Sequence, residues 1–147
     1  MYTKILLATD GSRHAAKTAE YARDLVKLNA AATAEIVYVR RVNREYHAYR
    51  WAEVEVPLHG EALKKVEAAE QEILAQARGL FEAAGLAAKT RVLTGDPAGE
   101  LCRVAADEGF DLIVMGSRGM SELAGLLLGS VSERVLHLAH CPVAIVK

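Results

Sequence analysis

The chain has 147 residues, 52% of them hydrophobic, and a formal net charge of −1 at pH 7. This length suits one domain with a buried core. The composition argues against a disordered chain, and the charge argues against a nucleic-acid-binding protein. No apolar run approaches the roughly 20 residues that cross a bilayer, so we expect no membrane partner. Residues 1–4 lead straight into an apolar run without a signal-peptide pattern, and we expect a cytoplasmic protein.

The two cysteines, Cys102 and Cys141, are far apart in the sequence and do not have the spacing of metal ligands. Cys102 falls in a helical pattern, and Cys141 comes just before the last apolar run. In a cytoplasmic protein such thiols stay reduced. We therefore expect two free, buried thiols and no disulfide.

The first forty residues alternate between strand and helix patterns. Residues 4–9 are almost continuously apolar, which is typical of a central parallel strand covered on both faces. A turn follows at residues 10–12, where Ser12 is the expected N-cap of the next helix. Small and apolar residues at helical spacing then predict a helix over 13–29, followed by a second strand over 34–39.

The segment 40–59 has no clean period and is rich in aromatic and histidine side chains: Tyr46, His47, Tyr49, Trp51 and His59. Loops of this length inside compact domains are usually functional or mobile. We expect a partly ordered flap over part of the binding site. A partner surface, or packing of an aromatic side chain on a sheet edge, is the alternative.

The rest of the chain continues the alternation. Helices are predicted over 61–84, 97–108 and 131–139, and strands over 87–93, 111–115 and 143–146. In the long helix over 61–84 an apolar stripe predicts the buried face. The charged residues of this helix are expected to face water: Lys64, Lys65, Glu67, Glu70 and Glu72. Gly85 is its expected C-terminal stop, and Pro97 is expected at the start of the next helix.

This β-α-β-α-β-α-β-α-β pattern predicts a single α/β domain over 1–147. Such alternation gives a doubly wound parallel sheet with helices on both faces, and we expect five strands in the order 3-2-1-4-5. In that order the first and fourth strands are neighbours, and the winding reverses between them. Ligands bind at such a switch point, beyond the carboxyl ends of the strands. Asp10 and Gly116 should therefore meet at one crevice.

Residues 116–130 read G-S-R-G-M-S-E-L-A-G-L-L-L-G-S and join the strand at 111–115 to the helix at 131–139. Glycine lets another molecule approach the backbone closely, and free N–H groups with a partial positive charge lie at a helix start. The loop therefore predicts a phosphate site. The alternative is a loop that glycine allows to pack, with Ser130 and Glu133 forming a capping box.

The spacing Gly116, two residues, Gly119, nine residues, Gly129, Ser130 resembles that of the universal stress protein family. Nucleotide-binding members of that family hold the phosphates of ATP in a G-x2-G-x9-G-S/T loop after the fourth strand. The resemblance extends from KILLATDGS at 4–12 to PVAIV at 142–146. It implies an adenine nucleotide alpha hydrolase-like fold that binds ATP or another adenine nucleotide together with Mg²⁺ or Mn²⁺.

The resemblance also implies which residues contact the nucleotide. Adenine would contact Ala8, Thr9 and the backbone of Val39, and the ribose would contact Asp10, Met115 and Gly116. The phosphates would contact Gly119, Gly129, Ser130, Val131 and Ser132. Arg118 occupies a variable loop position, where it either pairs with a phosphate or points to solvent. Asp10 would repel phosphate unless a divalent cation lies between them. It could instead bond a ribose hydroxyl, or simply cap the first helix.

The chain lacks the lysine-bearing P-loop motif, and no residue pair stands out as base and nucleophile. Fast phosphoryl transfer needs a positioned water and strong charge stabilisation. We therefore expect an ATP-binding protein of stress response or signalling, with at most slow hydrolysis and no residue assigned as catalytic. The alternatives are a slow ATPase or nucleotide-transferring enzyme, and a dimeric adaptor that works without nucleotide.

The last predicted strand bears on assembly. It is short and apolar, and the proposed order places it at the sheet edge: Val143, Ala144, Ile145 and Val146. An uncovered edge invites pairing with another chain, and a symmetric pair would be a homodimer, as the family resemblance also implies. The alternative is an edge shielded by Lys147 and a neighbouring loop.

Overall fold

The structure is a computed structural model that describes residues 1–42, 44–47, 52–55, 58–117 and 128–147. Its elements, in chain order, are β1 (Lys4–Ala8), α1 (Ala15–Leu28), β2 (Thr33–Arg40), β3 (Arg44–His47), β4 (Ala52–Glu55), α2 (Gly60–Glu82), β5 (Lys89–Thr94), α3 (Pro97–Asp107), β6 (Leu112–Gly116), α4 (Ser130–Leu138) and β7 (Val143–Val146).

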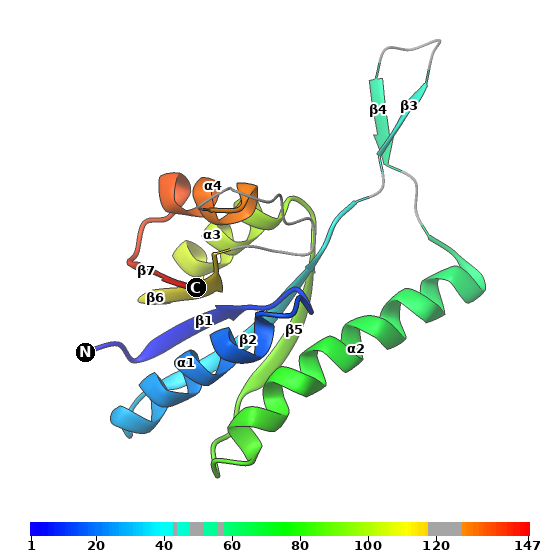
Figure 1. Ribbon diagram of the computed structural model, residues 1–147. Coiled ribbons are helices and arrows are strands. Elements are labelled where there is room, and N and C mark those ends of the chain that lie inside the picture. The colour runs from blue at the N-terminus through cyan, green and yellow to red at the C-terminus, as the bar shows by residue number, and fades with distance from the viewer. Residues whose placement is uncertain (43, 48–51, 56–57, 118–127) are drawn as a thin grey trace.

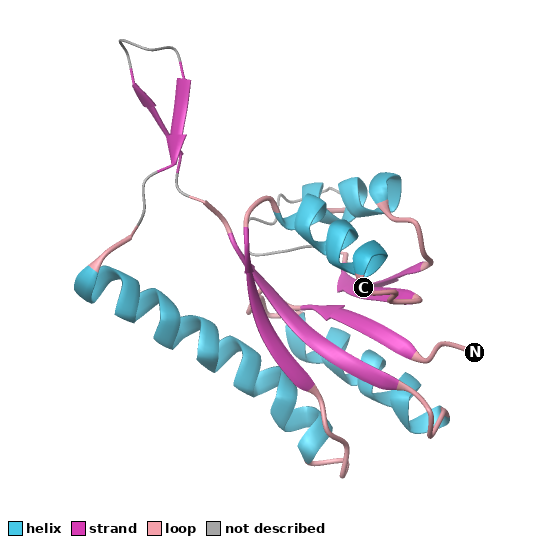
Figure 2. Ribbon diagram, turned by 180° about the vertical axis from the view of Figure 1, so that it is seen from behind, coloured by secondary structure: helices cyan, strands magenta, loops and turns pink. Residues whose placement is uncertain are grey.

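The main sheet has five parallel strands in the order β5-β2-β1-β6-β7, which confirms the predicted order. Leu7 on the central strand lies beside Ile36 of β2 and Val114 of β6. Helices α1 and α2 cover one face of the sheet, and α3 and α4 cover the other (Figures 1 and 2). The chain is therefore a three-layer, doubly wound α/β fold, as its alternating pattern predicts.

The central strand shows why its sequence is apolar without alternation. Ile5 and Leu7 pack into the core between the sheet and helices α1 and α2, whereas Leu6 packs into the core beneath α3 and α4. All three side chains are at most 1% exposed. Burying each contributes about 2–3 kcal/mol, so β1 stabilises both layers at once.

Helix α2 confirms most of its predicted stripe and corrects one position. Ala77 and Phe81 of that stripe are buried, as is Leu74, which the prediction did not include, and the helix is followed by Gly85 with a φ of 74°. Glu70, however, is only 2% exposed and does not face water. It occupies the same helical stripe as the apolar residues, because four residues separate it from Leu74, and it is paired with an arginine of β2.

The segment after β2 differs from the predicted loop. β3 and β4 form a two-stranded antiparallel sheet in which Arg44 pairs with Glu55 and His47 with Ala52. These strands stand away from the five-stranded sheet rather than lying over its edge as a flap (Figures 1 and 2). The sequence hides them because they pair with each other and not with the core, so no apolar alternation marks them.

Two predicted helix starts are also corrected. Helix α1 begins at Ala15, with His14 and not Ser12 at the N-cap position. Helix α4 already includes Ser130, and Gly129 is its N-cap. A capping box needs its serine at the N-cap, so Ser130 and Glu133 do not form one.

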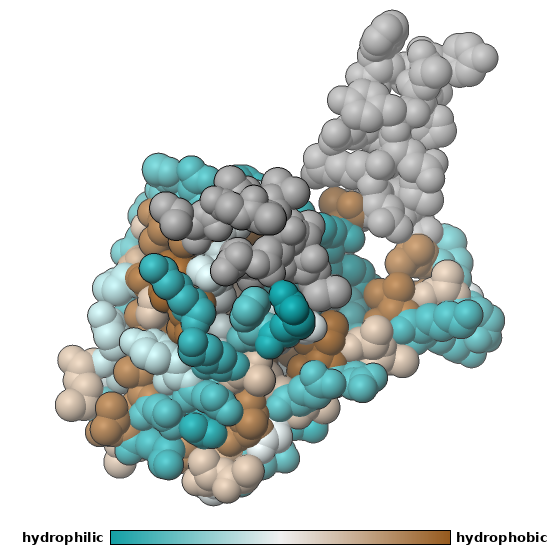
Figure 3. Space-filling view, viewed as in Figure 1, coloured by the Kyte–Doolittle hydropathy of each residue, from teal (hydrophilic) through white to brown (hydrophobic). Residues whose placement is uncertain are grey.

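Three further expectations concern the thiols, the surface and the membrane. Both cysteines are free, as predicted, and Cys102 is buried, but Cys141 is only half-buried. Hydrophilic residues cover much of the visible surface, with hydrophobic patches among them (Figure 3). Within the described ranges, the structure contains no helix long and apolar enough to cross a membrane.

Candidate functional site at the carboxyl edge of the sheet

The candidate site lies where β1 and β6 end side by side. β1 pairs with β2 on one side and β6 on the other, and β6 then pairs with β7. The chain therefore winds in opposite directions from these two central strands, which is the switch point of a doubly wound sheet. Ala8 ends β1 and Gly116 ends β6. The segments that follow these two strands therefore begin at the same edge of the sheet, as predicted for Asp10 and Gly116.

The turn after β1 is held in a defined shape. The Thr9 N–H donates to the Val37 carbonyl at 2.9 Å, which extends the β1–β2 ladder by one residue. Asp10 Oδ1 accepts a hydrogen bond from the Ser12 N–H at 2.9 Å. The Asp10 side chain thus caps its own turn and not helix α1.

Glycine is required in this turn for two reasons. Gly11 has a φ of 74°, a left-handed backbone conformation that other residues seldom adopt. A Cβ at Gly11 would also lie 2.8 Å from Cγ1 of Ile73 on α2. The β1–α1 turn therefore packs directly against the middle of α2.

The second half of the site is the junction between β6 and α4. The Ser117 carbonyl accepts a hydrogen bond from the Gly129 N–H at 2.6 Å, and the Ser117 N–H donates to the Val146 carbonyl at 2.9 Å. The chain therefore leaves β6 and returns to α4 at almost the same point. The first-turn N–H groups of a helix lack intrahelical partners and carry a partial positive charge, and in this protein that turn starts at the switch point.

The Ser132 hydroxyl stabilises the same junction from inside. It lies 3.1 Å from the Ser117 carbonyl and 2.9 Å from the Gly129 carbonyl, and its one proton serves one of them at a time. Ser132 is 2% exposed. A ligand at this helix start would therefore meet the Ser132 backbone and not its hydroxyl.

The structure brings ten of the predicted site residues to this edge or its immediate neighbourhood: Ala8, Thr9, Asp10, Val39, Met115, Gly116, Gly129, Ser130, Val131 and Ser132. Two others, Arg118 and Gly119, lie outside the described residues. Thr9 and Met115 are 9% and 5% exposed, so they offer a ligand mainly backbone atoms. Ser130 lies at the first position of α4 and is exposed.

An ion pair that sequence reasoning missed lies at the end of β2. The Arg40 guanidinium donates from Nε to Glu70 Oε2 at 2.8 Å and from Nη2 to Glu70 Oε1 at 2.5 Å. The bonds to Glu70 raise the pKa of Arg40. The only sequence signal was an acidic residue placed on the apolar stripe of α2, since the two partners are thirty residues apart.

Tyr38 lies two residues before Arg40 on β2 and has a raised pKa. Burial raises the pKa of the Tyr38 phenol, and the nearby carboxylates of Glu70 and Asp10 raise it further. The Tyr38 ring packs against the core beneath α1 and α2. The phenol is therefore held neutral both by its burial and by the negative charge of two carboxylates.

A second missed contact joins the helices on the other face. Asp96 is the N-cap of α3 and accepts the Gly99 N–H at 2.9 Å. Its other oxygen accepts from Arg134 Nη1 on α4 at 2.8 Å. The Arg134 bond, with help from the Gly99 N–H, holds the pKa of Asp96 below its ordinary value. The start of α3 is thereby tied to α4.

The fold and this junction define a doubly wound α/β protein with a helix start at its switch point, a class that binds ligands beyond the strand ends. The model of the universal stress protein family matches residues 1–147, and the chain belongs to that family.

Individual relatives agree with this assignment. The chain is 37% identical over 147 residues to universal stress protein MJ0531 of Methanocaldococcus jannaschii, covering 100% of this chain and 83% of that protein. It is 37% identical over 149 residues to universal stress protein YxiE of Bacillus subtilis, covering 100% of both. A universal stress protein solved in complex with cAMP superposes with a TM-score of 0.74 at 25% identity, covering 99% of this chain and 97% of that one.

Proposed function

We propose that this protein binds an adenine nucleotide, ATP foremost, at the carboxyl edge between β1 and β6, and that it acts in stress response or signalling. The observation that carries the proposal is the Gly129 N–H bond to the Ser117 carbonyl. It sets the first turn of α4 at the switch point, where backbone donors and the helix dipole favour phosphate. The solved relative that holds cAMP supports an adenine nucleotide as the ligand class.

Asp10 is suited to act through a cation. Among the residues that the structure describes, no three metal-ligating side chains gather at one place. Mg²⁺ commonly takes one or two carboxylates and completes its shell with water and substrate phosphate oxygens. Asp10 stands at the crevice and would supply such a carboxylate, so Mg²⁺ or Mn²⁺ would bind together with the nucleotide.

We expect binding with at most slow hydrolysis. The Asp10 carboxylate holds its own turn through Ser12, and the Ser132 hydroxyl holds the loop base. Both groups therefore do structural work at the crevice, whereas phosphoryl transfer needs a group that orients the attacking water. Nucleotide occupancy, and not turnover, would then be the signal that a partner reads in the cytoplasm.

Strand β7 supports a homodimer. It is the last strand of the sheet, and its residues are all half-buried in the single chain: Val143, Ala144, Ile145 and Val146. A second copy pairing through the same strand would bury this apolar edge symmetrically. Sedimentation equilibrium of the purified protein measures the assembly directly, and a monomer at all concentrations would contradict it.

The binding proposal is tested by calorimetric titration with ATP, with and without Mg²⁺, beside an assay for released phosphate. The informative variant is Gly129→Val, which places a branched side chain at the mouth of the α4 helix start. The matched control is Gly79→Val on α2, where a Cβ would meet no atom within 4 Å. We expect Gly129→Val to weaken ATP binding by at least about tenfold, and Gly79→Val to bind as the wild type does.

Each outcome has a defined meaning. Binding that Gly129→Val leaves unchanged would place the nucleotide elsewhere. Steady release of phosphate at a substantial rate would make the protein an ATPase. A wild-type protein that binds no adenine nucleotide would leave the dimeric adaptor as the function of this fold.

A further inference from the structure

The Arg40–Glu70 pair lies on the side of the crevice opposite α4. Arg40 is the last residue of β2, and β2 is separated from β6 by the central strand β1. A nucleotide with its phosphates at the α4 start and its chain across the end of β1 would therefore extend its nucleoside toward the end of β2. The pair stands beside the nucleoside half of such a ligand and away from its phosphates.

The pair fixes the end of β2 at two points. Both carboxylate oxygens of Glu70 are engaged by Arg40, and such two-point contacts define orientation as well as distance. The Glu70 side chain is 3% exposed and the Arg40 side chain 26% exposed. Because the bonds are shielded from water, they hold the strand end more firmly than a surface pair would.

The same stretch of α2 also supports the β1–α1 turn. Ile73 comes three residues after Glu70, on the same side of the helix, and its side chain lies where a Cβ of Gly11 would be. Gly11 also lies one residue after Asp10, whose side chain holds the same turn through the Ser12 N–H. One rigid helical segment thus positions the ends of both strands over which the nucleoside would lie.

We propose that Arg40 and Glu70 are positioning residues that determine how well the site distinguishes adenine from other bases. The inference rests on the proposed nucleotide binding. The pair touches no phosphate; it acts by holding the backbone at the end of β2 in one place relative to the β1–α1 turn. A base is read by hydrogen bonds whose value depends on placement to within a fraction of an ångström.

A second pair in the molecule provides the control. Arg91 on β5 makes the same two-point contact with Glu108, Nη1 to Oε1 at 2.7 Å and Nη2 to Oε2 at 2.8 Å. Glu108 is the C-cap of α3, and the β6 strand begins four residues later. This pair therefore lies toward the amino ends of the strands, far from the crevice.

The experiment compares Arg40→Lys with Arg91→Lys. Lysine keeps the charge but loses the fork that makes two parallel bonds. For each protein the dissociation constants of ATP and GTP are measured by calorimetry with Mg²⁺, and folding is checked by thermal unfolding. The ratio of the two constants reports base recognition alone, because both ligands carry the same triphosphate.

We expect the wild type to prefer ATP and Arg40→Lys to reduce that preference by about tenfold, the value of one or two well-placed hydrogen bonds. Arg91→Lys should keep the wild-type ratio. Glu70→Gln, which keeps the shape but removes the charge, should act like Arg40→Lys and provides a second reading if Arg40→Lys folds poorly.

The alternative is that the pair only stabilises the fold, in which case Arg40→Lys weakens both nucleotides equally and the ratio stays unchanged. That result would overturn the inference, as would an equal loss of preference in Arg91→Lys or a wild type that does not discriminate. A wild type that binds neither nucleotide would instead contradict the proposed function itself.

Discussion

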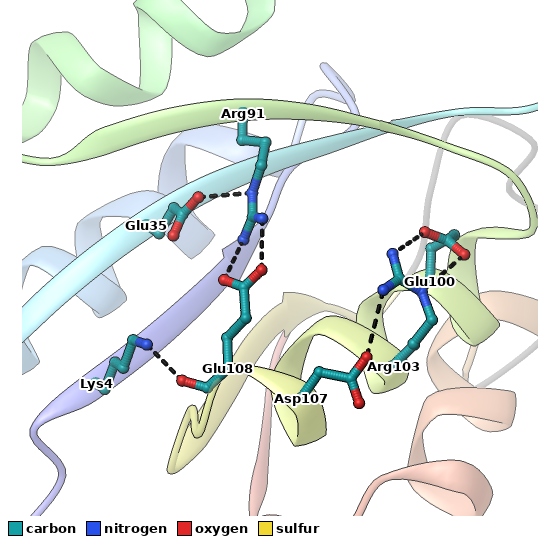
Figure 4. A network of polar contacts seen from close by, with 7 residues as sticks. All are labelled: Lys4, Glu35, Arg91, Glu100, Arg103, Asp107 and Glu108. Carbon is teal, nitrogen blue, oxygen red and sulfur yellow. Dashed lines mark hydrogen bonds and ion pairs between the residues drawn. The ribbon is translucent and has the colours of Figure 1, made fainter.

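Similar ion pairs lie at the amino edge and at the carboxyl edge of the sheet, where the strands begin and end, but they have different roles. At the amino edge, Arg91 bridges β2 and α3: its Nε lies 2.7 Å from Glu35 Oε1, and its Nη atoms bond Glu108 (Figure 4). The Glu35 contact is an ion pair between partly exposed side chains, 30% exposed for Arg91 and 18% for Glu35. Lys4 adds a bond to the Glu108 carbonyl and lies 4.5 Å from the centre of the Phe110 ring.

At this amino edge the charged side chains of Arg91, Glu35 and Glu108 pair with one another. Together with Lys4 they join β1, β2, β5 and the end of α3. At the carboxyl edge the bonds hold the β1–α1 turn and the junction of β6 with the start of α4 in place. The pKa of both Arg40 and Arg91 is raised, chiefly by the hydrogen bond to a glutamate. The Arg40–Glu70 and Arg91–Glu108 pairs are therefore alike in their bonding. What distinguishes them is the edge of the sheet at which each pair lies.

Two glycines with nearly equal backbone angles provide the strongest test of this contrast. Gly11 at the carboxyl edge has a φ of 74° and Gly109 at the amino edge 70°. Gly109→Ala meets no atom within 4 Å, so it should cost only the left-handed strain of about 1 kcal/mol. Gly11→Ala adds the clash with Ile73 and should cost about 2–4 kcal/mol. Urea unfolding of both variants measures the difference.

A double-mutant cycle separates the clash from the strain. Ile73→Ala removes the atoms that a Cβ at Gly11 would meet, so the double variant should be more stable than the sum of the two single changes predicts. Strict additivity would show that Gly11 is required for its backbone angle alone, and the two edges would then be alike in this respect.

Asp111 provides the next largest effect, at the amino edge. Its Oδ2 accepts the Thr3 N–H at 2.8 Å and the Thr3 hydroxyl at 2.9 Å, and its Oδ1 accepts the Lys4 N–H at 3.0 Å. Asp111→Asn replaces one of these oxygens by an amide donor facing N–H groups, so it should cost about 1–2 kcal/mol near pH 7. Chemical unfolding of the variant beside the wild type measures it.

The same substitution predicts a pH dependence. Burial raises the pKa of Asp111, but the bonds from Thr3 and Lys4 outweigh it, and the folded-state pKa lies below the ordinary value of 3.8. Its stabilisation is therefore complete above the unfolded pKa and is lost as pH falls through the folded pKa. Wild type and Asp111→Asn should converge in stability as the solution is acidified below about pH 4. A gap that stays constant with acidification would contradict the assignment.

Asp96 provides the smallest effect, at the carboxyl edge. Asn is as good an N-cap as Asp, so Asp96→Asn keeps the bond from the Gly99 N–H and loses only the pairing with Arg134. Their side chains are 46% and 55% exposed, and the loss should be about 0.5 kcal/mol. Asp96→Ala removes the cap as well and should cost about 1 kcal/mol more. Equal losses in both variants would mean that the ion pair, and not the cap, holds α3.

Much of the molecule was predictable because its signals are local. The unbroken apolar run of β1, the stripe of α2 and the Gly85 stop each follow from a few neighbouring residues. Alternation and handedness left few strand orders, and the family resemblance implied the one that the structure has. The strand and the helix on either side of the glycine-rich segment were predicted correctly, although α4 begins one residue earlier than predicted.

The sequence by itself therefore determined the layers, the strand order and the edge at which the candidate site lies, since periodicity and chain handedness are written in short stretches. Only the tertiary structure decided which polar groups meet. Glu70 reads as a solvated residue until Arg40, thirty positions away, is brought beside it. The sequence predicts Ser132 as a phosphate contact, but only the structure shows that its hydroxyl bonds within the junction of β6 and α4, which leaves the backbone for a ligand. Such contacts depend on how elements that are far apart in the sequence pack together, and a local sequence pattern does not predict that packing.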